Sequence, residues 1–475
     1  MAAISAKGGA VRDSEEVEVL ACRKALCYRC RVYGGDFGRS FSVNCVRRSA
    51  NGVAHALARF ARLSDNETVW LEKNPPPAVD ALDAFPPLDK DAEYPEYRYN
   101  IHMCDNSYPK TASWKEDTDC WSIPSSLSNF TQITYLALAS NSFSGLLPLS
   151  LFNLPNLSTL YLHNNQLVGP LPNHISGLLN LKDLYLSSNF LNGTLPSWLF
   201  SLPSLVKLYI NGNQFIGEIG EFKSNSLEYL DLGYNKLQGS IPRSISTFVN
   251  LTYLSLSSNN WSIMLELEMI SKLKNLYYLD FSNNLVSINN NVTYTLPNLY
   301  TLNLSSCNIS EFPIFLRTPT NIEFLDLSKN RIYGQVPRWL GHVGSDSLYF
   351  LDLRNNLFQG PFPTLNFLSI QYLFVSNNKF TGEIPSSICN ASALDIQDLS
   401  HNNLSGMIPK CLVHSNVLSM LDLQMNILHG TIPATFSTRN RFRNINLNGN
   451  QLEGPLPQSL ANCRNLELGS SRSWK

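Results

Sequence analysis

Four cysteines near the amino terminus come closest to a metal-binding pattern. Cys22, Cys27 and Cys30 lie close together, and Cys45 follows them. Cysteine thiolates grouped in this way can bind zinc in a tetrahedral site. However, the spacing between Cys22 and Cys27 is unusual for zinc, and a helical pattern around Cys22 accounts for that residue without a metal. We therefore expect no metal site.

The same region is strongly basic. Between Cys22 and Arg62 the sequence has nine basic side chains and one acidic side chain, Asp36. Such an excess of positive charge suits a phosphate-rich partner. Apolar residues at helical spacing predict two amphipathic helices here, over Ser14–Leu26 and Ser49–Arg62.

The rest of the sequence offers little that suggests catalysis. It contains no nucleophile–base arrangement, Walker loop, dinucleotide fingerprint or His-x-x-x-His motif, and its eight histidines are scattered. We expect a protein that is not an enzyme and that uses no cofactor.

The composition excludes several further classes of protein. Among 475 residues, 36 Lys and Arg oppose 37 Asp and Glu, so the net charge of −1 creates no overall electrostatic field. Hydrophobic residues make up 44% of the chain, which is enough for a large core. The first residues lack the apolar stretch of a signal peptide, and no apolar run reaches the roughly 18 residues of a membrane helix. As written, the chain is expected to have neither an export signal nor a membrane segment.

The chain changes character near residue 130. Residues 1–130 carry 34 charged side chains, whereas the 345 residues after them carry 39. Beyond this point, leucines at alternate positions followed by an asparagine recur about every 24 residues. The asparagine position occurs fourteen times, at Asn141, Asn165, Asn189, Asn213, Asn235, Asn259, Asn284, Cys307, Asn330, Asn356, Asn378, Asn402, Asn426 and Asn450.

This repeat predicts a solenoid. Each Leu-x-Leu segment forms a short strand with its leucines inside, and the strands of successive repeats pair in parallel. The asparagine amide is expected to bond to backbone groups that stacking buries, and Cys307 would do so weakly. The predicted fold class is an α/β solenoid, a right-handed leucine-rich-repeat superhelix of about 14 repeats, preceded by a small, incomplete α+β segment.

The repeats resemble the plant-specific class of leucine-rich repeats. Three segments are similar to plant receptor-like proteins of the disease-resistance type: SYPKTASWKEDTDCW (Ser107–Trp121), ICNASALDIQDLSHNNLSGMIPKCL (Ile388–Leu412) and LNGNQLEGPLPQSLANCRNLE (Leu447–Glu467). The resemblance implies an ectodomain at the plasma membrane or cell surface that binds an extracellular peptide, protein or glycan ligand. It also implies signalling through a receptor-like kinase co-receptor, in pathogen recognition or development.

The variable residues of the strands are the expected ligand contacts, because their side chains project from the concave face. They combine aromatic rings with carboxylates, which suits a peptide or sugar. Alternatively, these residues are ordinary repeat filler that stacks on itself. The predicted contacts are Tyr161, Tyr185, Tyr209, Tyr229, Tyr253, Tyr278, Asp280, Asp326, Asp352, Phe374, Asp398 and Asp422.

Two further features suit an exported protein. Cys389 and Cys411 lie almost one repeat apart, so they could form a disulfide between adjacent coils. Asn-x-Ser/Thr sequons are also frequent, although an asparagine-rich repeat inflates their number. The predicted glycosylation sites are Asn129, Asn156, Asn192, Asn250, Asn260, Asn291, Asn308, Asn390 and Asn403.

Phrases near the amino terminus, among them VRRSANGVAHALARFA and ETVWLEKNPPP, resemble the ribonuclease H-like domain of plant retroelements. That family cuts RNA–DNA hybrids with carboxylates that hold two divalent metals. Glu18 matches the carboxylate that the family carries on a helix, but His55 stands in place of the final aspartate, and the other two carboxylates are missing. A single carboxylate cannot hold the metal pair, so we expect a remnant without activity.

Five regions follow from these patterns. They are a degenerate ribonuclease H-like fragment (1–73), a Pro-rich linker (74–103), a truncated repeat cap (104–130), the leucine-rich repeats (131–466) and an unstructured tail (467–475). The leading hypothesis is a receptor-like ectodomain truncated before its membrane anchor, without nucleic acid as a partner. The alternatives are an inactive nucleic-acid-binding ribonuclease H-like protein and a soluble intracellular repeat scaffold.

Overall fold

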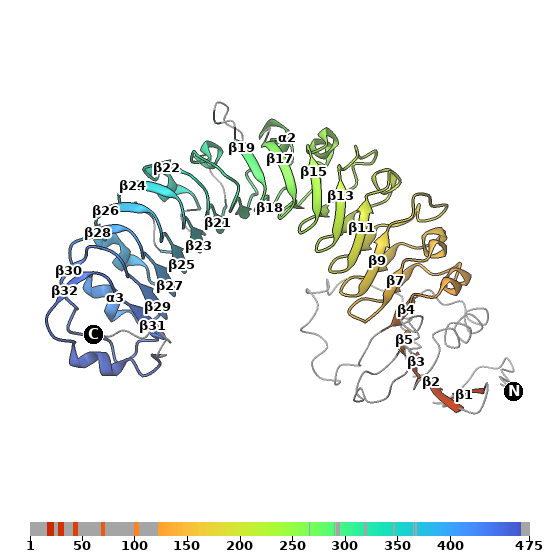
Figure 1. The fold of residues 1–475 in the computed structure, drawn as a ribbon, viewed down its shortest axis with the longest axis horizontal. Coiled ribbons are helices and arrows are strands. Elements are labelled where there is room, and N and C mark those ends of the chain that lie inside the picture. The colour runs from red at the N-terminus through yellow and green to blue at the C-terminus, as the bar shows by residue number, and fades with distance from the viewer. Residues whose placement is uncertain are drawn as a thin grey trace. The chain divides into compact units, whose positions relative to one another are not determined.

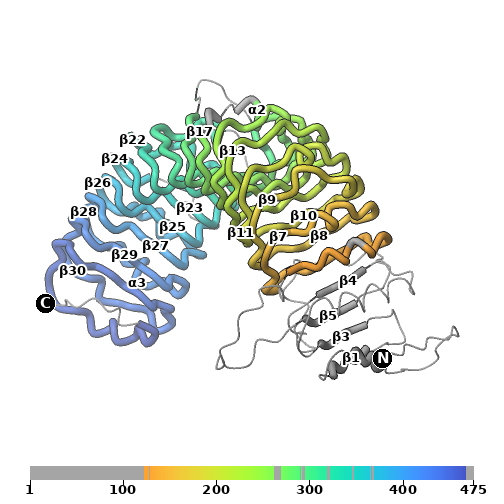
Figure 2. The backbone as a smooth tube through the Cα atoms, turned by 45° about the vertical axis from the view of Figure 1, so that its right-hand side comes forward, coloured from red at the N-terminus to blue at the C-terminus, as the bar shows by residue number. Residues whose placement is uncertain are grey.

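The computed structural model describes residues 122–466, apart from 266, 289, 291–294, 318–320, 345–346, 364 and 366–367, and five strands nearer the amino terminus. The chain divides into two compact units, Met1–Leu237 and Gln238–Lys475. In both units the backbone winds through successive coils of one kind, as Figure 2 shows. These coils confirm the predicted α/β solenoid.

In the first unit, the Leu-x-Leu segments form one parallel sheet, which we term its inner sheet (Figure 1). Its regular strands are β6 (Tyr135–Ala137), β8 (Thr159–Tyr161), β10 (Asp183–Tyr185), β12 (Lys207–Tyr209) and β14 (Tyr229–Asp231). Each strand pairs with the next so that leucine lies opposite leucine, as Leu160 does with Leu184. The central leucines of the five strands are completely buried and form the core.

A second parallel sheet in this unit follows the turn after each inner strand. It consists of β7 (Ser144–Leu146), β9 (Gln166–Pro170), β11 (Phe190–Thr194), β13 (Gln214–Gly217) and the first two residues of β15 (Lys236–Gly239). Gly169 has a φ of +81°, a left-handed backbone conformation that residues with a side chain rarely adopt. The turn therefore requires glycine. Short 3₁₀ helices complete the coils: η2 (Ser125–Asn129), η3 (Leu149–Asn153) and η4 (Leu199–Ser201).

The second unit has an inner sheet of the same kind, again with consecutive parallel strands. The strands are β16 (Tyr253–Ser255), β18 (Tyr278–Asp280), β20 (Thr301–Asn303), β21 (Phe324–Asp326), β23 (Phe350–Asp352), β25 (Tyr372–Phe374), β27 (Ile396–Asp398), β29 (Met420–Asp422) and β31 (Asn444–Asn446).

The strands that follow the inner strands of the second unit vary more in length, from two residues in β22 to six in β17. The remaining strands are β17 (Asn260–Leu265), β19 (Leu285–Ile288), β22 (Tyr333–Gly334), β24 (Leu357–Pro361), β26 (Lys379–Glu383), β28 (Asn403–Ser405), β30 (His429–Thr431) and β32 (Gln451–Glu453). The helices are η5 (Arg243–Thr247), α2 (Leu267–Ser271), η6 (Ile314–Arg317), η7 (Arg338–His342), η8 (Ser386–Asn390), α3 (Lys410–His414) and η9 (Gln458–Asn462).

The asparagines form the predicted hydrogen-bond ladder between coils. Nδ2 of Asn165 donates to the carbonyl of Leu138 in the preceding coil at 2.8 Å, and its Oδ1 accepts from the N–H of Phe143 at 3.0 Å. These bonds satisfy backbone groups that stacking removes from water. The same arrangement recurs at Asn189, Asn213, Asn235, Asn284, Asn330, Asn356, Asn378, Asn402, Asn426 and Asn450.

Cys307 replaces asparagine in this ladder, and the backbone compensates for it. Its thiol reaches the carbonyl of Phe281 at 3.2 Å, which is a weak contact. An asparagine at position 307 would accept a hydrogen bond from the N–H of Val286. Here that N–H donates instead to the backbone carbonyl of Cys307, at 3.0 Å. Burial raises the pKa of this thiol to about 12.

Nearer the amino terminus the structure corrects one prediction. The described strands there are β1 (Val17–Cys22), β2 (Cys27–Val32), β3 (Phe41–Cys45), β4 (Thr68–Leu71) and β5 (Tyr99–Met103). The helix predicted over Ser14–Leu26 is wrong, because β1 pairs antiparallel with β2. Val17 and Val19 alternate with Glu18, and β-branched residues at this spacing favour a strand.

Other predictions near the termini stay untested. Strand β5 lies inside the range 74–103 that we predicted as a linker. The helix predicted over Ser49–Arg62 and the tail 467–475 lie outside the described residues.

Candidate functional site: the exposed row of the inner strands

A row of tyrosines covers the outward face of the inner sheet in the first unit. We term Tyr135, Tyr161, Tyr185, Tyr209 and Tyr229 the tyrosine row; all five are half-buried. The ring centroids of Tyr161 and Tyr185 lie 4.5 Å apart in an edge-to-face arrangement, and those of Tyr185 and Tyr209 lie 4.5 Å apart in a stack. Because neighbouring rings cover each other's faces, the row presents ring edges and hydroxyl groups to a partner.

Polar side chains from neighbouring columns surround this row. Lys207 Nζ lies 5.2 Å from the ring centre of Tyr229, and Thr159 Oγ1 donates to Asp183 Oδ2 at 3.4 Å. Burial raises the pKa of Asp183, and the charge of Lys207 opposes that shift. Burial also raises the pKa of Tyr185 and Tyr209, so their hydroxyls stay protonated. The row therefore offers neutral hydrogen-bonding groups on an apolar surface.

His163 belongs to the same surface. Its ring lies 5.9 Å from the rings of both Tyr161 and Tyr185, and burial lowers its pKa. Its buried Nδ1 has no hydrogen-bond partner among the described residues. Lys207 pairs with Tyr229 and therefore lies in a column that supplied predicted contacts, whereas His163 lies two residues after Tyr161 in a column that supplied none. Sequence reasoning could have found Lys207 by considering every side chain of its column and His163 by considering the next column.

In the second unit the predicted carboxylates act mainly within the fold. Oδ1 of Asp280, Asp326, Asp352, Asp398 and Asp422 accepts the backbone N–H two residues later, at 2.8 to 3.1 Å. Asp280, Asp352 and Asp422 are 8%, 1% and 8% exposed, so little of their surface can meet a ligand. Asp326 and Asp398 are half-buried and more accessible.

Arg354 is a second basic residue, besides Lys207, that sequence reasoning missed. Its Nε donates to both carboxylate oxygens of Asp352, at 3.1 and 3.0 Å, and its guanidinium lies 4.4 Å from the ring centre of Phe374. The guanidinium offsets the negative charge of Asp352 and covers part of the Phe374 ring. The signal was its place two residues after a strand carboxylate, where the repeats of Asp280, Asp326 and Asp398 have serine.

Aromatic side chains in the second unit stack across neighbouring strands. The rings of Tyr253 and Tyr278 lie 4.2 Å apart, and those of Phe324 and Phe350 lie 4.1 Å apart, both nearly parallel. Such cross-strand pairs stabilise the sheet whether or not a ligand is present. The predicted contacts on these strands therefore have a structural role as well.

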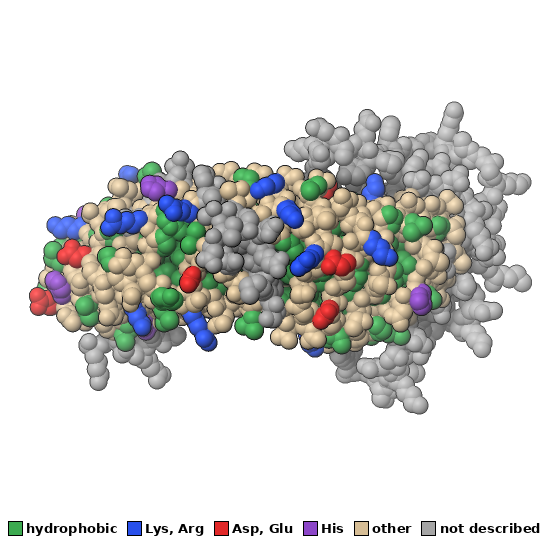
Figure 3. All heavy atoms as spheres, turned by 90° about the horizontal axis from the view of Figure 1, so that it is seen from above, with side chains coloured by type: hydrophobic (Ala, Val, Ile, Leu, Met, Phe, Trp, Pro, Cys, Tyr) green, Lys and Arg blue, Asp and Glu red, His purple; other side chains and the backbone are tan. Residues whose placement is uncertain are grey.

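The cysteines and sequons lie away from the inner strands. Cys389 and Cys411 form a disulfide that joins η8 to α3, with their Cα atoms 5.5 Å apart. Seven of the predicted sequon asparagines are exposed, Asn156 is half-buried, and Asn291 lies outside the described residues. On the face that Figure 3 shows, charged side chains are spread singly among polar ones and form no single patch.

The described residues contain no cluster of His, Cys, Asp or Glu that could hold a metal ion. Within the same part of the chain, every helix is too short or too polar to cross a bilayer. Glu18 lies on strand β1, and no side chain is described there; His55 lies outside the described residues.

Sequence comparisons agree with the coil geometry. The leucine rich repeat family models match residues 220–260 and six further segments, 156–178, 180–202, 298–318, 321–343, 369–391 and 441–463. These segments are leucine-rich repeats.

The chain is similar to plant receptors. In an alignment 177 positions long, which covers 32% of this chain, it is 41% identical to receptor-like protein 47 of Arabidopsis thaliana, and the match spans only 22% of that relative. Among solved structures, a TDR receptor has 29% identity and a TM-score of 0.61, over 73% of this chain and 65% of that one. The plant peptide hormone receptor RGFR1 in complex with RGF2 has 28% identity and a TM-score of 0.58, over 73% and 60%.

Proposed function

We propose that this protein is the ligand-binding ectodomain of a plant receptor-like protein and that the tyrosine row is its main contact surface. The observation that carries the proposal is the unbroken row of five tyrosines on the inner sheet of the first unit. The leucines on the other side of these strands form the core, so the rings are not needed to fill it. Large amphipathic side chains grouped on one exposed face are typical of binding surfaces.

A peptide is the ligand class that the chemistry of the row favours. Ring edges carry partial positive charge, and the neutral hydroxyls can donate hydrogen bonds, so both suit the carbonyl oxygens of an extended backbone. A sugar ring would instead pack on the face of an aromatic ring, and these faces are partly covered by neighbouring rings. The similarity to a receptor solved with a peptide hormone supports the same choice.

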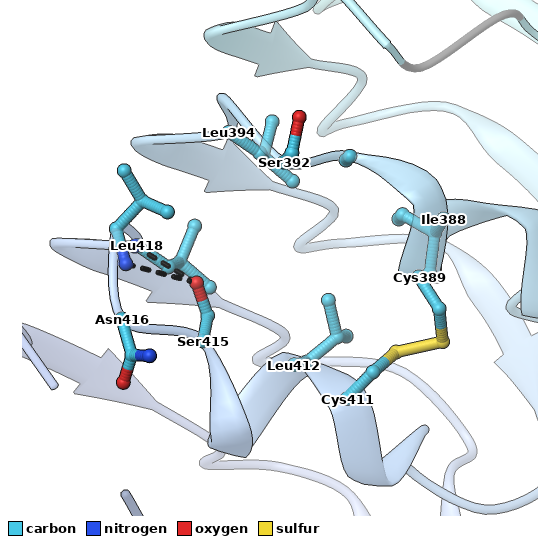
Figure 4. Close-up of a pocket in the computed structure, with 11 residues that line it drawn as sticks. Ile388, Cys389, Ser392, Leu394, Cys411, Leu412, Ser415, Asn416 and Leu418 are labelled. Atoms are coloured by element: carbon cyan, nitrogen blue, oxygen red, sulfur yellow. Dashed lines mark hydrogen bonds between the residues drawn. A yellow bond between two sulfur atoms is a disulfide. The ribbon is translucent and has the colours of Figure 1, made fainter. Parts of the chain in front are cut away.

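A cell-surface location fits the described chemistry. The Cys389–Cys411 disulfide (Figure 4) is stable in an oxidising compartment, and exposed sequons such as Asn192 and Asn403 can accept glycans there. We therefore propose a role in pathogen recognition or developmental signalling through a receptor-like kinase partner. The chain spans only about a fifth of the relative named above, so the partner and the pathway belong to the proposal.

Selection of peptides on the full chain tests this function. Linear peptides selected from a random displayed library should lose at least about tenfold in affinity for Tyr185→Ala, because hot-spot tyrosines contribute more than about 1.4 kcal/mol. The matched control is Tyr277→Ala, since Tyr277 is 47% exposed on the second unit and lies outside the row. If the selected peptides bind both variants equally well, the tyrosine row is not the ligand site.

We propose separately that residues 1–73 are an inactive ribonuclease H-like remnant. Strand β1 supports this, because the family carries the matching carboxylate on a helix, whereas Glu18 is on a strand. The full chain with Mg²⁺ should leave an RNA–DNA hybrid intact. Cleavage that disappears in Glu18→Gln would contradict the proposal.

A further inference from the structure

An exposed row of apolar side chains crosses the second sheet of the first unit. Leu146 on β7 pairs with Val168 on β9, and Val168 pairs with Phe190 on β11. Figures 1 and 2 show these three strands side by side. The three side chains are exposed, whereas Leu167 and Leu191, which alternate with them along the strands, are completely buried. The row, which we term the apolar row, therefore faces water on the side of the sheet away from the core.

One end of the apolar row lies next to a sequon. Asn192 and Thr194 follow Phe190 at alternate positions of β11, and all three residues are exposed. Alternate residues of a strand point to one face of the sheet and lie about 7 Å apart along it. The asparagine that would carry a glycan and the phenylalanine are therefore neighbours on the same surface.

The fold leaves Asn192 able to carry a glycan. Within the described part of the chain, neither its side chain nor the Thr194 hydroxyl makes a hydrogen bond that a glycan would break. Across the sheet Asn192 pairs with Pro170 on β9 and with Gln214 on β13, and both are exposed. A sugar attached to Asn192 would thus have an apolar residue along the strand, Phe190, and another across it, Pro170.

The chemistry of the first sugar matches this surface. N-acetylglucosamine, which begins an asparagine-linked glycan, is neutral and has a face of C–H groups. Such a face packs on the face of an aromatic ring, which carries partial negative charge. Phe190 is 51% exposed, and no other ring of the described residues stacks on it, so a sugar can reach its ring. In the tyrosine row, by contrast, neighbouring rings cover one another.

The spacing of the residues does not create this arrangement by itself. Phe248, Asn250 and Thr252 have the same order and spacing in the second unit. However, Phe248 is completely buried, so it cannot meet a sugar on the exposed Asn250. Only at Asn192 does the fold place the ring of such a phenylalanine on the surface.

We propose that a glycan on Asn192 folds back onto its own sheet, with its first sugar packed on the ring of Phe190 and beside Pro170. The glycan then covers the end of the apolar row. It is the occupant that the structure favours, because its attachment point lies on the same face of the same strand. This inference rests on the cell-surface location proposed above, since such glycans are added to exported proteins.

Release of glycans from the folded full chain tests the proposal. The chain is secreted from yeast behind a cleavable export signal and treated, without denaturant, with peptide-N-glycosidase, which cuts the bond between asparagine and the first sugar. Mass spectrometry measures the rate at each site. Phe190→Ala should speed release at Asn192 about fivefold, because a sugar packed on the ring shields that bond. Phe190→Tyr keeps the ring and should retain the original rate.

The matched control is Leu357→Ala, which should leave release at Asn192 unchanged. Leu357 is an exposed apolar residue at the place that Phe190 has in its own coil, but its strand, β24, carries no sequon. Release at Asn129, which is exposed in η2 of the first unit, should be the same in Phe190→Ala as in the original chain.

Three results would overturn the proposal. They are an Asn192 without glycan, an unchanged rate at Asn192 in Phe190→Ala, and an equal acceleration at Asn129 and Asn192, which would indicate a loosened fold. An unchanged rate would leave the apolar row to a protein partner or a second copy of the chain. Because the experiment supplies the export signal, none of these results decides the function of the tyrosine row, which peptide selection tests separately.

Discussion

The backbone N–H of Cys307 donates a 3.0 Å hydrogen bond to Oδ1 of Asn330, which also accepts the N–H of Ile309 at 3.0 Å. In other coils the asparagine oxygen accepts one such bond from the coil before it, as Asn165 does from Phe143. Asn330 thus supports the one coil whose own asparagine is missing. The ladder tolerates Cys307 because its neighbour in the next coil takes on an additional bond.

Asn330→Ala should therefore be strongly destabilising. The substitution leaves the N–H groups of Cys307 and Ile309 and the carbonyl of Leu304 without partners in the core, whereas the carbonyl of Leu327 still accepts from Asn356 Nδ2. At about 1 kcal/mol or more for each buried group, we expect a loss of roughly 3 kcal/mol or more in urea unfolding. The control is Asn403→Ala on the exposed edge of β28, which should cost less than about 0.5 kcal/mol. Equal losses would contradict the role of the ladder.

Gln397→Leu should make the protein more stable. Gln397 is completely buried on β27 between Leu373 and Leu421, and neither Nε2 nor Oε1 has a hydrogen-bond partner among the described residues. Leucine removes both unsatisfied groups, so the free energy of unfolding should rise by about 2 kcal/mol. Gln424→Leu should bring no gain, because Gln424 Nε2 donates to Asp422. A loss of stability in Gln397→Leu would indicate that this side chain is satisfied in solution.

The Cys389–Cys411 disulfide should contribute about 3 kcal/mol, since it closes a loop of 22 residues. Dithiothreitol should lower the thermal midpoint of the original chain and leave that of the double variant Cys389→Ala/Cys411→Ala unchanged. The same reductant effect on both proteins would assign the stabilisation to other cysteines. Mass spectrometry after alkylation verifies the pairing independently.

Asp326→Asn should raise the thermal midpoint at pH 7 by a few degrees. Burial, together with the nearby charge of Asp352, raises the pKa of Asp326 above its ordinary 3.8. The carboxyl group of Asp326 therefore loses its proton at a lower pH in the unfolded chain than in the folded chain. The protonated group makes its full contribution to the free energy of unfolding below pH 3.8, and this contribution is lost as the pH rises through the folded-state pKa. Asparagine keeps the acceptor for the N–H of Ser328 without the buried charge.

The gain from Asp326→Asn should accordingly shrink as the pH falls toward 3.8, the ordinary pKa of aspartate. Thermal unfolding measured at several pH values gives the test. Gln359→Ala, at an exposed position of β24, removes no titrating group and should show no such dependence. If the stability gained by Asp326→Asn grew as the pH fell, the folded protein would favour the ionised form of Asp326, and the prediction would be wrong.

Gly177→Ala should cost about 3 kcal/mol, because a Cβ atom there would lie 2.5 Å from the backbone carbon of Asn153 in the preceding coil. A Cβ atom on Gly382 would meet no other atom within 4 Å, but this glycine has a φ of +76°, so Gly382→Ala should cost only about 1 kcal/mol of backbone strain. Urea midpoints of the two variants decide the order. If Gly382→Ala were the more destabilising variant, backbone strain in the turn at Gly382 would outweigh the steric clash at Gly177.

Repeat length and hydrogen-bond chemistry could be read from the sequence. Leu160 and Leu162 specify a strand with one buried face, and Asn165 provides an amide for backbone groups of the preceding coil that stacking buries. The strand and the asparagine hydrogen bonds both depend on residues within one repeat or its immediate neighbour. The region around Glu18 was predicted less well, because a short segment with both helical and alternating apolar spacing can form either element.

The sequence by itself therefore determined the solenoid and the columns of side chains that cover it, because a regular period fixes which positions face inward. Only the tertiary structure decided what those columns do. Asp352 turns out to be buried against Arg354. Two phenylalanines precede a sequon by two residues, and Phe190 is exposed whereas Phe248 is buried. Both outcomes depend on the sizes and charges of side chains that meet across coils, and a pattern within one repeat does not contain that information.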